Sequence, residues 1–420
     1  MVPIKLLAQH LEMAARNVIA REESSANRQV LDLLDKARQQ LVSTSATSSV
    51  LEKVPPEASE LQKVLHLLSD AHSGNGAPPG EWVDGTWVDD SGNIWGFKKY
   101  ENLDPGWIES LVDYYLYVDN KRPFPGQGEA PPRIPIPDTA RIALVGDWGT
   151  GINPALQIGL DIQAEGPDIT IHLGDVYYAG TPTEEMERFT SHWPTGKLGS
   201  FMLNSNHEMY SGLRGYMQAL GDAKFAQQQG FSQFALENSH WMLIGLDSAY
   251  YAGGHFYSDG NLNPQTQLPW LTSMAQEAQR NDKQLILLTH HHGLDLSNAP
   301  QLLWGQITGA LNGMAALWYW GHIHAAVAHP EQQGIQGRCV GHGAIPAAPP
   351  PILMRNRSSV VWFEDQSAHD PQSPQRTLNG YMRLTLDGAM VTEEFVAENK
   401  QVRWKNQLGQ SARPALRNIG

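Results

Sequence analysis

The sequence predicts an α/β fold from residue 138 onward, and three observations support this prediction. Short apolar runs recur along this part of the chain, as is typical of buried strands. Stretches with helical patterns separate some of these runs. Several runs are followed closely by Gly-Asp or by histidine, which indicates that polar side chains gather at the ends of the strands.

Length and composition limit the class of protein. A chain of 420 residues can form two domains, or one large domain with an appendage. Its 41% hydrophobic residues can bury a sizeable core, which excludes wholesale disorder. The single cysteine, Cys339, excludes an intramolecular disulfide framework and a cysteine-rich metal site.

Charge and hydropathy predict where the protein acts. The net charge of −14 argues against a broad nucleic-acid surface. No apolar run approaches the ~18 residues of a membrane span. The first residues also lack the apolar core of a secretory signal. We therefore expect a cytoplasmic protein that binds neither nucleic acid nor a membrane.

Residues 1–137 are expected to form a mainly helical accessory region. Apolar side chains recur at helical spacing within 4–18, 30–41 and 61–68. The Trp-bearing segment 81–100 contains Asp-Gly and Ser-Gly turns and predicts a small β-hairpin. Asp104 and Pro105 then predict the start of another helix. We expect this region to contact a partner or a second copy of the chain.

The predicted strands follow a linker. Residues 124–138 are rich in proline and glycine, so the segment is expected to be extended and the domain boundary is placed at residue 138. The predicted strands are 141–145, 168–173, 201–203, 241–246, 284–289 and 316–320. Further strand-like runs follow residue 337, two of them around an Asp387-Gly388 turn. The stretches 344–351 and 365–379 are predicted loops.

Polar side chains follow five of these strands. In chain order they are Asp147; Asp175 and Tyr178; Asn206 and His207; His290, His291 and His292; and His322 and His324. Because the carboxyl ends of strands in an open α/β sheet line one crevice, we expect them to meet. Carboxylates, an amide, a phenol and imidazoles suit first-row metal ions. These ligands are too many for one tetrahedral ion, so a pair of ions sharing a carboxylate is predicted.

These motifs resemble the calcineurin-like metallophosphoesterase superfamily from about residue 141 to the C-terminal strands. The resemblance implies a four-layer α/β/β/α sandwich. Most members carry Asp-x-His in the first motif, whereas this chain has Asp147-Trp148-Gly149. With Tyr178 in place of the missing ligand, the chain is similar to the purple acid phosphatase branch. Ser205 stands where the family has glycine.

The resemblance also implies a role for each motif residue. Asp147, Asp175, Tyr178 and His324 would hold the first ion, and Asp175, Asn206, His290 and His322 the second. His291 is the alternative to His290. The first ion would be Fe(III), bound through Tyr178, and the second Fe(II), Zn(II) or Mn(II). His207 would contact the phosphate and protonate the leaving group.

The implied reaction is hydrolysis of a small phosphate ester by metal-bound hydroxide. The preferred activity is that of an acid-phosphatase-like phosphomonoesterase. A phosphodiesterase acting on cyclic nucleotides or other small diesters uses the same ligands and is the alternative. A non-catalytic binding or scaffold protein on this fold is the remaining alternative, although all the ligand positions are filled. Among the other histidines, His172 is expected to be hydrogen-bonded in the core or behind the metal ligands, and His255 and His342 are weaker candidates for the edge of the pocket.

Overall fold

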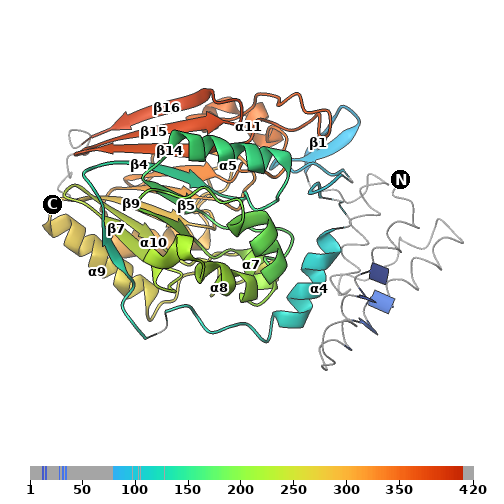
Figure 1. Ribbon diagram of the computed structural model, residues 1–420. Coiled ribbons are helices and arrows are strands. Elements are labelled where there is room, and N and C mark those ends of the chain that lie inside the picture. The colour runs from blue at the N-terminus through green and yellow to red at the C-terminus, as the bar shows by residue number, and fades with distance from the viewer. Residues whose placement is uncertain are drawn as a thin grey trace, which may run out of the picture.

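The computed structural model describes residues 79–409 except 97, 103, 105 and 127, together with a few residues between 12 and 35 (Figure 1). Those few residues are helical. The rest of the helices predicted within residues 1–78 lies outside the described part. Within that part, no helix has the length and apolar character needed to cross a membrane.

Two large sheets form the centre of the molecule. The six-stranded sheet has the order β16 (Val402–Leu408), β15 (Met390–Ala397), β14 (Gly380–Asp387), β4 (Thr139–Val145), β5 (Ile169–His172), β6 (Gly199–Met202). The eight-stranded sheet has the order β13 (Trp362–Phe363), β11 (Ala326–Ala328), β12 (Ile335–Val340), β10 (Ala316–Trp320), β9 (Gln284–Thr289), β8 (Trp241–Gly245), β7 (Phe234–Glu237), β3 (Arg133–Pro135).

Each sheet is buried on both faces. On β4, Leu144 packs against the other sheet, whereas Val145 packs under α5 (Asn153–Glu165) and α8 (Arg214–Leu220). On β9, Ile286 faces the other sheet and Leu287 packs under α9 (Gln267–Arg280) and α10 (Leu302–Leu311). Burial on both faces explains the continuous apolar runs. The predicted four-layer α/β/β/α sandwich is confirmed.

Parallel pairing aligns the strand ends that carry the predicted motifs. In the six-stranded sheet, Val145 of β4 pairs with His172 of β5, which pairs with Met202 of β6. In the eight-stranded sheet, Thr289 of β9 pairs with Trp320 of β10. The motifs therefore leave the same end of the sandwich, three from one sheet and two from the other, rather than from one open sheet.

The remaining elements are short. They are β1 (Gly80–Val83), β2 (Thr86–Asp89), α4 (Trp107–Tyr117), α6 (Pro182–Glu184), the π-helix η2 (Glu185–Thr190), α7 (Asn206–Tyr210), α11 (Pro351–Arg355), and the 3-10 helices η3 (Ala223–Gln228), η4 (His255–Tyr257) and η5 (Arg357–Ser359). β1 and β2 form the predicted hairpin around Asp84-Gly85.

Two local predictions differ from the structure. α4 begins at Trp107 with Gly106 as its N-cap, and Asp104 instead accepts a hydrogen bond from the Gly106 N–H at 2.9 Å. Pro105 lies outside the described residues. Within the predicted linker, β3 pairs with β7 at the edge of the eight-stranded sheet, where Pro135 is tolerated because one side of an edge strand is unpaired.

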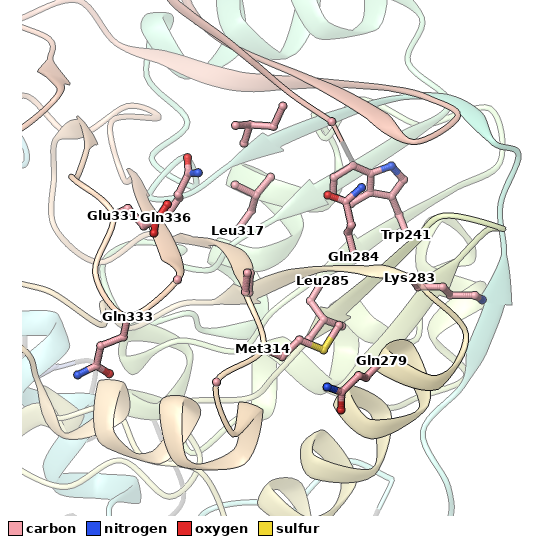
Figure 2. Close-up of a pocket in the computed structure, with 16 residues that line it drawn as sticks. Trp241, Gln279, Lys283, Gln284, Leu285, Met314, Leu317, Glu331, Gln333 and Gln336 are labelled. Carbon is pink, nitrogen blue, oxygen red and sulfur yellow. The ribbon is translucent and has the colours of Figure 1, made fainter. Parts of the chain in front are cut away.

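A cavity of about 400 Å³ opens at the opposite end of the strands from the motifs (Figure 2). Trp241, Leu285 and Leu317, at the starts of β8, β9 and β10, line it together with Met314. Its lysine, Lys283, pairs with Glu237 at 2.8 Å. No histidine lines this cavity, so the predicted chemistry lies elsewhere.

Candidate metal centre

Three predicted ligands have strained backbones directly after their strands. Asp147 follows β4, Asp175 follows β5 and His322 follows β10, with φ angles of 58°, 78° and 68°. A residue other than glycine in this left-handed region costs on the order of 1–3 kcal/mol. Such strain clusters at functional sites because the surrounding fold must hold it in place.

Glycines in the motifs make room for these side chains. Gly174 has a φ of 103°, and a Cβ there would lie 2.7 Å from His290 Nδ1. A Cβ on Gly321 would lie 2.6 Å from Asp147 Oδ2. Glycine in Gly174-Asp175 and Gly321-His322 is therefore required by close approach.

The first cluster contains Asp147, Asp175 and His324, whose ligand atoms lie within 4.8 Å of one another. The Tyr177 hydroxyl completes it, at 3.1 Å from Asp147 Oδ1 and 2.8 Å from Asp175 Oδ2. It also lies 3.2 Å from His324 Nε2. A phenol oxygen thus joins the two carboxylates and the imidazole.

Tyr178, the predicted phenol ligand, points away from this cluster. Its hydroxyl donates to Asp104 Oδ2 at 2.5 Å. In the structure, the phenol oxygen beside the two carboxylates is therefore that of Tyr177 and not that of the predicted Tyr178. The resemblance selected Tyr178 by its position three residues after Asp175, and the sequence does not show that Asp104, from a distant part of the chain, takes up the Tyr178 hydroxyl.

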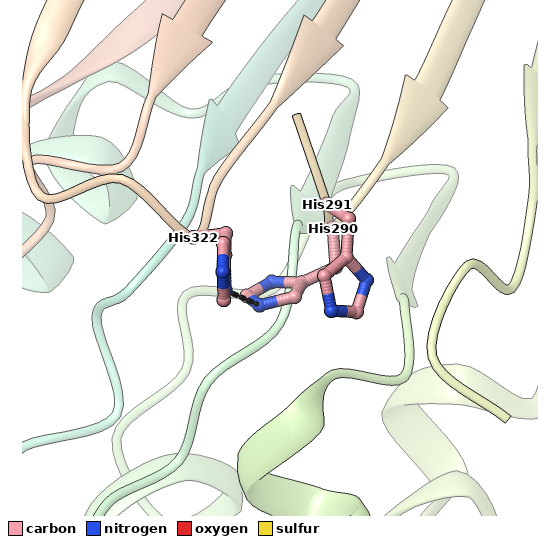
Figure 3. A group of neighbouring side chains, drawn as sticks. All are labelled: His290, His291 and His322. Atoms are coloured by element: carbon pink, nitrogen blue, oxygen red, sulfur yellow. Dashed lines mark hydrogen bonds between the residues drawn. The ribbon is translucent and has the colours of Figure 1, made fainter. Parts of the chain in front are cut away.

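The second cluster contains His290, His322 and Asn206, and His291 lies beside it; one ring nitrogen of each of the three histidines lies within 4.8 Å of the others (Figure 3). Asn206 Oδ1 lies 2.8 Å from His290 Nε2 and 3.1 Å from His322 Nδ1. The two imidazole nitrogens are 3.3 Å apart. Asp175 Oδ1 lies 3.3 Å from His290 Nε2, so this carboxylate contacts both clusters.

Hydrogen bonds decide which histidine after β9 is available as a ligand. His290 Nδ1 lies 2.9 Å from the Leu173 carbonyl oxygen and donates to it, which leaves Nε2 free of hydrogen and directed at the cluster. His291 lies beside the cluster, but its Nε2 donates to the Tyr257 carbonyl oxygen at 2.8 Å and its Nδ1 accepts from the Ser248 hydroxyl at 3.0 Å. Both nitrogens of His291 are occupied, so the geometry favours His290.

The protonation states suit metal ions. Burial lowers the pKa of His290 and His322, and lowers that of His324 to about 4, so all three are neutral at pH 7, the form that binds metals. Burial and the nearby Asp175 carboxylate raise the pKa of Asp147 well above its usual range. In the described part of the chain neither carboxylate pairs with lysine or arginine. The donor set therefore fits two cations that share Asp175.

Ser205 lies behind the shared carboxylate. Its hydroxyl is hydrogen-bonded to Asp175 Oδ1 and to Glu208 Oε2, and it accepts from the His207 N–H at 3.1 Å. Burial and the charge of Asp175 raise the pKa of Glu208 to about 8. The φ of Ser205 is −134°, so serine fits without strain where the resembling family has glycine. The sequence identified Ser205 as a departure but gave no sign of this contact.

His207 lies beside the first cluster with one ring nitrogen fixed. Its Nδ1 donates to the Tyr178 carbonyl oxygen at 2.7 Å. Its Nε2 lies 3.8 Å from Asp175 Oδ2. The ring therefore presents Nε2 toward Asp175, the carboxylate that contacts both clusters.

Comparison with known proteins agrees with this geometry. Residues 140–326 match the calcineurin-like phosphoesterase family. The matched domain contains every residue of both clusters. No curated protein matches the sequence. The purple acid phosphatase-like branch stays a prediction.

Three solved structures are among those similar to this chain. GAP50, the anchor in the inner membrane complex of Plasmodium, has 14% identity and a TM-score of 0.48, covering 64% of this chain and 89% of that chain. A dimetal phosphatase from Danio rerio has 10% identity and a TM-score of 0.44, and the match covers 64% of this chain and 98% of that chain. Yfce, a phosphoesterase from E. coli, has 11% identity and a TM-score of 0.24, and the match covers 63% of this chain and 98% of that chain.

The other histidines of the matched domain and its flank lie outside the clusters. His172 is buried beside Phe189, with ring centroids 4.5 Å apart, but neither ring nitrogen has a hydrogen-bond partner in the described part. The expected core position of His172 is therefore confirmed, but the expected hydrogen bonds of its ring are not found among the described residues. His342 is buried against Phe395, with ring centroids 5.5 Å apart. His255 belongs to η4, and its side chain lies outside the described ones.

Proposed function

We propose that this protein hydrolyses a phosphate ester at a centre of two metal ions. The observation that supports this most strongly is the position of Asp175. Its Oδ2 is 2.8 Å from the Tyr177 hydroxyl in one cluster, and its Oδ1 is 3.3 Å from His290 Nε2 in the other. A carboxylate with one oxygen toward each donor set can bridge two ions, the arrangement used for in-line displacement at phosphorus.

The proposed ligands follow the two clusters. The first ion would be held by Asp147, Asp175, Tyr177 and His324, and the second by Asp175, Asn206, His290 and His322. When bound, the ions supply a water of lowered pKa and positive charge that stabilises the negative charge developing on the phosphate. This charge also explains how a chain with a net charge of −14 can bind an anionic substrate.

His207 is the proposed general acid. The Tyr178 carbonyl holds its Nδ1–H, so Nε2 is the atom that can give a proton to the leaving oxygen. We propose a small phosphomonoester as the first substrate class and a small diester as the alternative, with neither nucleic acid nor a membrane as a partner.

We further propose Fe(III) in the first cluster, with Fe(II), Zn(II) or Mn(II) in the second. A phenol oxygen beside two carboxylates is a hard donor set, and such donors suit a trivalent first-row ion. Iron bound by a phenolate would colour the purified protein in the visible range. A colourless, fully active protein that contains only zinc or manganese would contradict the iron assignment but not the two-ion site.

A substrate panel combined with metal analysis tests the proposed function. Elemental analysis should find about two ions per chain. The protein should hydrolyse p-nitrophenyl phosphate faster than bis-p-nitrophenyl phosphate or a cyclic nucleotide, and Asp175→Asn should abolish both binding of the ion pair and hydrolysis. Faster hydrolysis of the diesters would favour the alternative that the protein is a phosphodiesterase. Two bound ions without hydrolysis of any substrate would favour a non-catalytic protein.

A further inference from the structure

A segment that precedes the matched domain reaches the metal centre. Trp107, the first residue of α4, packs against Tyr177, Tyr178 and His207, with ring centroids 5.9, 5.0 and 5.8 Å away. Its indole N–H donates to the Glu101 carbonyl oxygen at 2.8 Å, which fixes the orientation of the ring. The proposed general acid therefore rests on a side chain from outside residues 140–326.

The same segment holds Tyr178 at both of its polar ends. Asp104 Oδ2 accepts from the Tyr178 hydroxyl at 2.5 Å and from the Tyr100 N–H at 2.7 Å. At the other end, the Ser110 hydroxyl donates to the Tyr178 carbonyl oxygen at 2.6 Å. That carbonyl also accepts from His207 Nδ1 at 2.7 Å, so both of its lone pairs are used.

The packing between the segment and Tyr178 is close. A Cβ on Gly106 would lie 2.4 Å from Tyr178 Cζ. The Tyr178 ring also packs on Tyr100, with centroids 4.8 Å apart. Tyr178 is 6% exposed, so it has little room to change its conformation while Asp104, Gly106 and Ser110 stay in place.

We propose that Asp104, Trp107 and Ser110 form a positioning clamp for His207, an inference that rests on the proposed function. Asp104 and Ser110 fix Tyr178, the Tyr178 carbonyl fixes the hydrogen on His207 Nδ1, and Trp107 limits rotation of the imidazole. His207 Nε2 is then held toward the ion pair, where it can give its proton to the leaving oxygen. Asp104, Trp107 and Ser110 are positioning residues, because they act through Tyr178 and His207 rather than on the substrate.

The clamp should matter most for leaving groups that need a proton. p-Nitrophenolate leaves without being protonated, whereas the alkoxide released from an alkyl phosphate must receive a proton to leave. General acid catalysis contributes about 10²–10⁴-fold, so partial loss of the His207 position should cost about 10- to 100-fold with an alkyl phosphate. The cost with p-nitrophenyl phosphate should stay below about threefold.

The test uses Ser110→Ala and Trp107→Phe in the full chain, with Ser91→Ala and Trp82→Phe as matched controls. Ser91 is exposed and Trp82 is 63% exposed, away from the clusters. Metal content and melting temperature are measured first for every variant. The kcat values for p-nitrophenyl phosphate and glycerol 2-phosphate are then compared. The clamp variants should keep both ions and lose activity mainly on glycerol 2-phosphate, whereas the controls should match the wild type. Equal losses on both substrates would overturn the proposal.

A second measurement does not depend on turnover. In the zinc-loaded protein, ¹⁵N spectra of labelled histidine report which ring nitrogen carries hydrogen, and His207→Gln assigns the signals. The wild type should show His207 with hydrogen on Nδ1, and both clamp variants should shift that signal. An unchanged signal would overturn the clamp. A wild type that hydrolyses neither substrate would overturn the proposed phosphomonoesterase function, and the spectra would still decide the clamp.

Discussion

The adjacent tyrosines give opposite predictions for one pair of variants, Tyr177→Phe and Tyr178→Phe. Tyr177→Phe removes the hydroxyl that lies 2.8 Å from Asp175 Oδ2 and 3.1 Å from Asp147 Oδ1. Tyr177 is a proposed ligand of the first ion, and losing even a residue that only orients a ligand costs about 10- to 100-fold in metal affinity. We therefore expect the dissociation constant of the first ion to rise by about 10- to 100-fold.

Tyr178→Phe is the matched control. It removes a hydroxyl bound to Asp104 at 2.5 Å, so it should lower the free energy of unfolding by about 1–2 kcal/mol and leave both ions in place. Competition with a chelator, followed by elemental analysis, measures the affinity. If the protein contains Fe(III), its visible absorption should vanish with Tyr177→Phe and persist with Tyr178→Phe. The opposite pattern would refute the geometry and restore Tyr178 as the ligand.

Three further variants test other parts of the structure. His290→Ala should lose the second ion, whereas His291→Ala should keep both ions, because its ring nitrogens bind Ser248 and Tyr257; elemental analysis separates the two. Gly174→Ala should lower metal content, since its Cβ would lie 2.7 Å from His290 Nδ1; full content would contradict the close approach. His172→Leu should flatten the pH dependence of urea unfolding. Burial lowers the pKa of His172 from 6.5 to about 3, so between these values the unfolded state binds more protons and stability rises with pH. The wild type should gain about 2 kcal/mol from pH 4 to 6 that the variant lacks.

The strands that carry the site could be predicted because burial on both faces leaves a clear pattern. β4 and β9 read as continuous apolar runs, since alternate residues pack against the other sheet and against helices. The arrangement in two sheets could not be read from these runs, and it came from the resemblance. β3 escaped prediction because its three residues lie in a proline-rich segment, and an edge strand needs hydrogen bonds on one side only.

The site could be located from the sequence, but its contacts could not. Gly-Asp and Gly-His at strand ends mark places where backbone and side chain approach closely, and such marks are local. The choice between Tyr177 and Tyr178 depends on Asp104, which lies 74 positions before Tyr178 in the chain. The hydrogen bonds that occupy His291 depend likewise on Ser248 and Tyr257. These partners are brought in by tertiary structure, for which neighbouring residues give no signal.

Several unfavourable terms lie together at the carboxyl ends of the strands that carry the motifs. Asp147, Asp175 and His322 have left-handed backbones, each costing on the order of 1–3 kcal/mol. Two carboxylates are buried there without lysine or arginine partners in the described part. The buried faces of both sheets hold these groups in place, and ions that bind only the folded chain would offset the cost, by about 2.7 kcal/mol each at 100 times the dissociation constant. A site that is costly without cations and complementary to them is consistent with the proposed metal centre rather than with a structural core.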